Sequence, residues 1–125
     1  MNVEWFTNAK DMVATIHDNN ITFNTVATNY FKDIYSTIIG YNIDENILLI
    51  KPVSKEEVDT KNISSSDLHS VSIKPSYSRI NGKNIIKKLC NYYPIDFSTN
   101  KAYRYLCEWS HEEKLIKIYL TKEVK

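Results

Sequence analysis

Two stretches of this chain that lie far apart share one pattern of apolar and polar residues. "YNIDENILLIK" at residues 41–51 combines a strand, a polar turn and a return strand, and "WSHEEKLIKIY" at residues 109–119 repeats this arrangement without a gap. Alternating apolar residues on both sides of a short polar turn are typical of a β-hairpin. A chain with two such hairpins has to bury two apolar strand pairs, so the sequence predicts a β-rich fold.

The similarity continues on the N-terminal side of each hairpin. There, "TVATNYFKDI" (25–34) and "GKNIIKKLCNYY" (82–93) place apolar residues at helical spacing. The segments that favour strands are 12–17, 21–24, 35–41, 47–53, 71–75, 79–81, 101–109 and 114–121. Each half then has the order strand, turn, short strand, helix, strand, hairpin turn and strand, which indicates an internal duplication.

The length of the chain limits how two such halves can be arranged. A unit of about 50 residues buries too little apolar surface to be stable alone, so we expect one domain over residues 1–125. The predicted fold class is α+β, β-rich, with two strand–helix–hairpin repeats packed as one intertwined domain with pseudo-two-fold symmetry. Repeat one covers about 12–53, a polar linker covers 54–70, and repeat two covers about 71–121.

The second repeat resembles a known family of small bacterial proteins. Residues 78–121 contain an Arg–Ile pair, a short helix of apolar and basic residues, and a hairpin that ends in alternating apolar residues. This pattern is similar to the AbrB-like swapped-hairpin family of SpoVT-AbrB, MazE and MraZ-type domains, although Asn84 stands where the family usually has Pro. Residues 21–53 look like a second, less basic copy. The resemblance implies DNA binding and transcriptional or antitoxin-like regulation, usually by a dimer.

The distribution of charge is uneven. Residues 1–70 carry five basic and ten acidic residues, whereas residues 71–125 carry eleven basic and five acidic ones. A basic half favours an anionic partner, but the two halves could also simply attract each other, and lysines on a helix are often only solvated. The sequence pI of about 7.7 is lower than that of a strongly basic DNA-binding domain. The candidate DNA-binding residues are Lys74, Arg79, Lys83, Lys87, Lys88 and Arg104.

Other kinds of chemistry have little support in the sequence. Cys90, Cys107 and His111 lack the close paired spacing of structural zinc ligands, so we predict no metal and no cofactor. The sequence contains no nucleophile elbow or HExxH motif, and two glycines cannot build a phosphate-binding loop. We therefore predict a protein that is not an enzyme. Two cysteines without a visible signal peptide, and no apolar run of membrane-spanning length, predict a cytoplasmic protein without a membrane partner.

Together, these observations predict a small cytoplasmic, bacterial DNA-binding regulator of AbrB-like type that contacts DNA phosphates through its basic second repeat. Its expected partners are duplex DNA and a second copy or another protein. The alternative is a non-catalytic protein–protein interaction module of phage or mobile-element origin. The nine tyrosines and two tryptophans are compatible with that alternative, because aromatic residues are enriched in protein interfaces.

Overall fold

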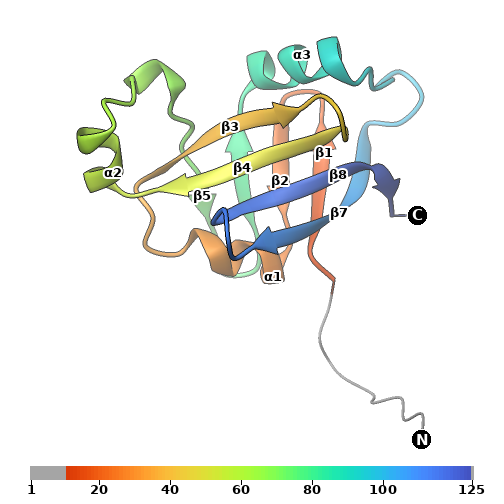
Figure 1. Cartoon of the computed structure of the whole chain (residues 1–125). Coiled ribbons are helices and arrows are strands. Elements are labelled where there is room, and N and C mark those ends of the chain that lie inside the picture. The colour runs from red at the N-terminus through yellow and green to blue at the C-terminus, as the bar shows by residue number, and fades with distance from the viewer. Residues whose placement is uncertain (1–10, 125) are drawn as a thin grey trace, which may run out of the picture.

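The computed structural model describes residues 11–124, and within them eight strands form one antiparallel sheet. The strands are β1 (Val13–His17), β2 (Asn20–Phe23), β3 (Ser36–Asn42), β4 (Ile47–Val53), β5 (Ser72–Ile73), β6 (Ser78–Asn81), β7 (Ala102–Ser110) and β8 (Leu115–Glu123). Their order across the sheet is β3-β4-β8-β7-β1-β2-β6-β5. The sheet is curled, so that β3, β4 and β8 cross in front of β1 and β2 in Figure 1.

The helices are short and lie at the ends of the curled sheet. They are α1 (Thr25–Thr28), the 3-10 turn η1 (Asn29–Phe31), α2 (Lys55–Thr60), the 3-10 turn η2 (Ser65–Asp67) and α3 (Lys83–Tyr92). In Figure 1, α3 covers one end of the sheet and α1 the other. The helix predicted at 82–93 is confirmed. The one predicted at 25–34 is wrong in its last part, because Lys32 is extended and Asp33 has a left-handed φ of 62°.

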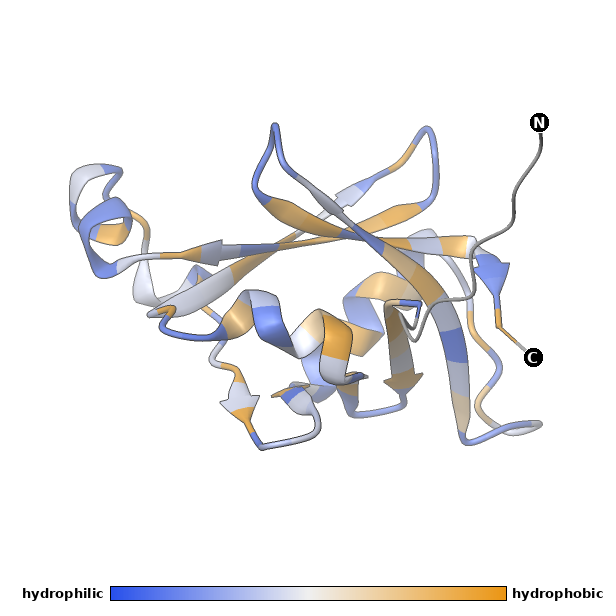
Figure 2. Cartoon of the chain, turned by 90° about the horizontal axis from the view of Figure 1, so that it is seen from below, coloured by the Kyte–Doolittle hydropathy of each residue, from blue (hydrophilic) through white to orange (hydrophobic). Residues whose placement is uncertain are grey.

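The hydrophobic core lies on the inner side of the curled sheet. Every second residue of a strand points into the core, for example Ile16 of β1, Ile21 of β2 and Ile80 of β6, which are all at most 1% exposed. Helix α3 adds Ile86 and Leu89 to the same cluster. Figure 2 shows the resulting pattern, with hydrophobic strands that meet in hydrophilic turns. The alternation therefore separates an inner apolar face from an outward polar face.

The two hairpins that look alike in the sequence use the same type of turn. Four residues connect β3 to β4 and β7 to β8, and the last of them has a left-handed backbone in both cases, with φ of 56° at Asn46 and 55° at Lys114. In the first turn, the Asn42 side chain accepts hydrogen bonds from the N–H groups of Asp44 and Glu45. The shared turn accounts for the similar spacing of polar and apolar residues in the two segments.

The predicted arrangement of two strand–helix–hairpin repeats about a pseudo-two-fold axis is wrong. The strands of residues 11–124 belong to a single curled sheet, in which pairs within one half alternate with the pairs β4–β8, β1–β7 and β2–β6 between the halves. The helical segments also differ, since α1 has four residues and α3 has ten. Edge-to-edge pairing satisfies the backbone hydrogen bonds of both hairpins at once, which stacking separate repeats does not.

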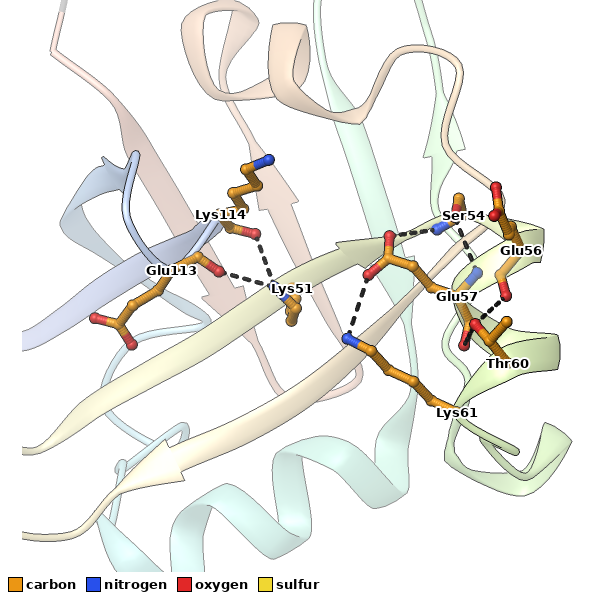
Figure 3. A network of polar contacts seen from close by, with 8 residues as sticks. All are labelled: Lys51, Ser54, Glu56, Glu57, Thr60, Lys61, Glu113 and Lys114. Carbon is orange, nitrogen blue, oxygen red and sulfur yellow. Dashed lines mark hydrogen bonds and ion pairs between the residues drawn. The ribbon is translucent and has the colours of Figure 1, made fainter.

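The two hairpins are joined by the pairing of β4 with β8, next to the edge strand β3. Strand β4 pairs with β8, with Leu49 opposite Lys117. At the end of this junction, the ammonium group of Lys51 donates a hydrogen bond to the backbone oxygen of Glu113 at 2.8 Å (Figure 3). Its second contact is with the backbone oxygen of Lys114 at 3.5 Å. A side chain on β4 thus holds the turn between β7 and β8.

The segment predicted as a polar linker, 54–70, contains α2 and η2. Ser54 caps α2 by accepting a hydrogen bond from the N–H of Glu57, whose carboxylate accepts one from the N–H of Ser54 (Figure 3). Lys61 lies 3.8 Å from the same carboxylate. None of the α2 side chains is buried. At the end of the segment, His69 forms an isolated antiparallel bridge with Thr37 of β3.

Candidate functional site

The six candidate DNA-binding residues lie on different parts of the fold. Arg79 is on β6 and Arg104 on β7, and Lys74 lies between β5 and β6. Three lysines are on α3: Lys83, Lys87 and Lys88. Arg79 is partly exposed, and the other five residues are exposed. All six are accessible, but they belong to more than one surface.

The two arginines lie in one row across the outward side of the sheet. Arg79 is opposite Thr22, Thr22 is opposite Thr15, and Thr15 is opposite Arg104. Residues directly opposite each other on antiparallel strands project to the same side. The next residues along the arginine strands, Ile80 and Tyr105, are buried in the core. We call the four side chains Arg79, Thr22, Thr15 and Arg104 the arginine face.

The arginine face has a hollow and an aromatic neighbour. The hollow has a volume of about 230 Å³ and is lined by residues that include Thr15, Thr22, Tyr77 and Arg104. The guanidinium carbon of Arg79 lies 5.5 Å from the centre of the Tyr77 ring, which is within the range of a cation–π contact. The Nε atom of Arg79 is buried without a hydrogen-bond partner among residues 11–124.

The charges of this face are not neutralised by the described part of the chain. Among residues 11–124 there are two ion pairs, Lys61 with Glu57 and Lys117 with Glu113, and neither includes a candidate DNA-binding residue. The outward strand residues next to the two arginines carry no carboxylate; they are Val13, Thr15, His17, Asn20, Thr22, Ser72, Asn81, Ala102 and Leu106. Glu108 is on the same side of β7, four residues after Arg104. An anion placed on the arginine face would meet two guanidinium groups and two hydroxyl groups.

The three lysines of α3 belong to another surface. Ile86 and Leu89 of α3 pack in the core together with Ile21, so the helix lies on the inner side of the sheet. The arginines point to the outer side. Lys83 and Lys87 are four residues apart on the solvent side of the helix, as predicted. The sheet consequently separates the lysines of α3 from the arginine face.

A larger groove, which the sequence did not indicate, lies where α3 meets the edge strand β3. Its volume is about 690 Å³, and Ile39, Tyr41, Ile85, Lys88 and Leu89 are among the residues that line it. Residues 62–64, 66, 67 and 69 form another wall. No short motif marks this groove, because its existence depends on which strand is at the edge of the sheet.

The cysteine and histidine that come closest to a metal-ligand pattern have different surroundings. Cys107 is buried in the core, and burial raises the pKa of its thiol to about 12, whereas His111 lies in the exposed turn between β7 and β8. Within residues 11–124, no three His, Cys, Asp or Glu side chains gather as metal ligands. Cys107 therefore contributes apolar volume to the core.

Comparison with known proteins adds no further constraint. No family model, no curated protein and no solved structure matches this chain. The AbrB-like resemblance rests on residues 78–121 and 21–53 alone and stays a prediction. In the described part of the chain, every helix is too short or too polar to span a bilayer.

Proposed function

We propose that this chain is a small cytoplasmic regulator that binds DNA and carries out no catalysis, and that the arginine face contacts the DNA phosphates. The observation that supports the proposal most directly is the row of Arg79, Thr22, Thr15 and Arg104, which has no carboxylate among the outward strand residues next to it. Arginine and threonine side chains are common phosphate ligands in protein–DNA complexes. The AbrB-like resemblance adds the regulatory role and a dimer.

The dimensions of the row suit a phosphate backbone. Adjacent strands are about 4.8 Å apart, so the Cα atoms of Arg79 and Arg104, three strands apart, are separated by about 14 Å. Successive phosphates of one strand of B-DNA advance by about 3.4 Å along the helix axis. Two arginines at this separation can each hold one phosphate while the threonine hydroxyls donate to phosphates between them. Contacts of this kind position DNA without reading its sequence.

The test is binding of a short labelled DNA duplex, measured by fluorescence anisotropy between about 50 and 200 mM salt. The double variant Arg79→Gln with Arg104→Gln should weaken binding and reduce the slope of log K against log salt by about 2, because two phosphate contacts are lost. Its thermal unfolding should be nearly unchanged, since surface substitutions usually alter stability by less than about 0.5 kcal/mol.

The matched control is Lys83→Gln with Lys87→Gln, which removes the same charge from α3. The proposal requires this variant to bind DNA much more tightly than the arginine variant. Equal losses would show that only net charge matters, and a larger loss in the lysine variant would move the interface to α3. Absence of binding by the unmodified chain, or binding that salt does not weaken, would exclude a phosphate interface.

The alternative function, a protein–protein interaction module, is favoured by a different observation. Strand β3 is at the edge of the sheet, and the groove of about 690 Å³ runs beside it. An open strand edge is a common site for binding a segment of another protein. The arginine face and this groove are on different surfaces, so the two functions can be tested separately.

A further inference from the structure

The free edge of β3 has backbone groups without partners. Along one edge, β3 pairs with β4 over its whole length. Along the opposite edge, Thr37 and His69 exchange two backbone hydrogen bonds, of 3.1 Å from the Thr37 N–H and 2.8 Å from the His69 N–H. Backbone groups of alternate residues in a strand point to the same side. The N–H and C=O groups of Ile39 and Tyr41 therefore also point away from β4, along the part of the free edge that follows this bridge.

These outward groups are not satisfied within the described part of the chain. No backbone hydrogen bond from Ile39 or Tyr41 to a residue on the outer side of β3 is present among residues 11–124. His69 thus begins a further strand of the sheet that stops after one residue. An unpaired, accessible edge of this kind is a template for an additional strand.

The groove beside this edge is formed by side chains that would contact such a strand. The side chains of Ile39 and Tyr41 lie on the core side of β3, where Ile85 and Leu89 of α3 line the opposite wall. Tyr41 stacks on Tyr92 of α3 with ring centres 4.9 Å apart. An extended segment paired with β3 would therefore place every second side chain between the strand edge and the helix.

The charges of the groove select the chemistry of the occupant. Helix α3 contributes three lysines and no carboxylate, and Lys88 itself lines the groove. Asp67 on the opposite wall is the acidic residue among those lining the groove. A second copy of β3 is a poor occupant, because "STIIGYN" has no acidic residue to offer Lys88 and a symmetric pair would bring the α3 lysines together.

We propose that an extended segment of another protein binds this groove by strand addition to β3, with an apolar residue against Ile85 and Leu89 and a carboxylate beside Lys88. The backbone bonds would extend the ladder that His69 begins, which supplies affinity, and the two side-chain contacts would supply specificity. The site does not depend on the arginine face or on DNA binding.

The experiment selects peptides from a displayed random library against the immobilised full chain and measures the enriched peptide by fluorescence anisotropy. The enriched sequences should alternate apolar residues and include Asp or Glu. On binding, hydrogen exchange at the amides of Ile39 and Tyr41 should slow at least tenfold. Failure to enrich any peptide, or enrichment of basic peptides, would overturn the proposal.

A pair of variants at one position tests the backbone contact. Ile39→Pro removes an outward N–H but leaves the hydrogen bonds between β3 and β4 in place. Ile39→Ala removes a similar amount of side chain and keeps that N–H. Peptide affinity should fall at least tenfold more in the proline variant than in the alanine variant. Equal affinities would overturn strand addition, and so would a chain dimer that Ile39→Pro dissociates, because a second copy would then occupy the edge.

The charge contact has its own test. Lys88→Glu should weaken the acidic peptide about tenfold, and a peptide with Lys in place of its acidic residue should recover affinity for this variant. Lys83→Glu is the matched control on the same helix and should change affinity less than twofold, because Lys83 does not line the groove. If Lys88→Glu weakens the acidic peptide and the peptide with Lys in place of its acidic residue does not bind this variant more tightly, the contact with Lys88 is contradicted. Thermal unfolding of each variant confirms that the chain is folded.

Discussion

At the scale of single residues, stability is concentrated in the inner face of the sheet. Ile116 has no exposed surface and lies opposite Ile50 of β4 and Trp109 of β7. Ile73 on the terminal strand β5 is 41% exposed. The two residues are chemically identical and differ only in their surroundings, so they report the contribution of burial.

We expect Ile116→Ala to lower the free energy of unfolding by about 2–5 kcal/mol, because it removes buried methyl groups and leaves a cavity. Ile73→Ala should change that free energy by less than about 0.5 kcal/mol. Urea unfolding followed by circular dichroism measures both. Similar effects of the two substitutions would mean that the core is not where the structure places it.

At the scale of elements, α2 is held mainly by contacts within its own segment, with one cation–π contact from Lys55 to the Tyr35 ring at 5.5 Å. The pKa of the Glu57 carboxyl is lowered from its usual 4.5, chiefly by its hydrogen bond with the backbone N–H of Ser54 and against a smaller effect of burial. A folded-state pKa below the unfolded value means that the carboxylate stabilises the helix above pH 4.5. This contribution is lost as the pH falls through the folded-state value.

We therefore expect α2 to open locally in acid while the sheet stays folded, since α2 buries no side chain. Hydrogen exchange of residues 55–61, measured by NMR and corrected for the intrinsic effect of pH, should show protection that decreases as the pH is lowered below 4.5. Ser54→Ala, which removes the cap, should reduce protection at neutral pH by about 1 kcal/mol. Protection that is independent of both pH and Ser54 would contradict the capping box.

Most elements of this chain are predictable from its sequence, but their pairing is not. Apolar alternation located the two long hairpins, and helical spacing located α3. The pairing of β1 with β7 joins residues from opposite ends of the chain, and no local pattern encodes it. The same limit applies to function. Charge selected Arg104, and charge together with the family resemblance selected Arg79, whereas their common row and the groove beside β3 depend on register and on sheet order.

At the scale of the whole molecule, the sheet order makes the two halves mutually dependent. Separation of the chain after residue 70 would leave β1 without β7, β2 without β6 and β4 without β8. We expect fragments 11–70 and 71–124 to be unfolded when they are prepared alone, as judged by circular dichroism, and to regain β structure when they are mixed. A cooperatively folded single fragment would show that one half is an independent unit.

The position of β1 also bears on how the protein is made in the cell. Val13 of β1 pairs with Leu106 of β7, which is synthesised much later. During synthesis, the apolar strand at 13–17 therefore emerges long before the strand that will lie beside it exists. The nascent chain carries this unpaired edge until residues 102–110 have been synthesised. This order of strands makes products that are truncated before residue 106 prone to aggregation. It also makes the incomplete polypeptide a substrate for chaperones.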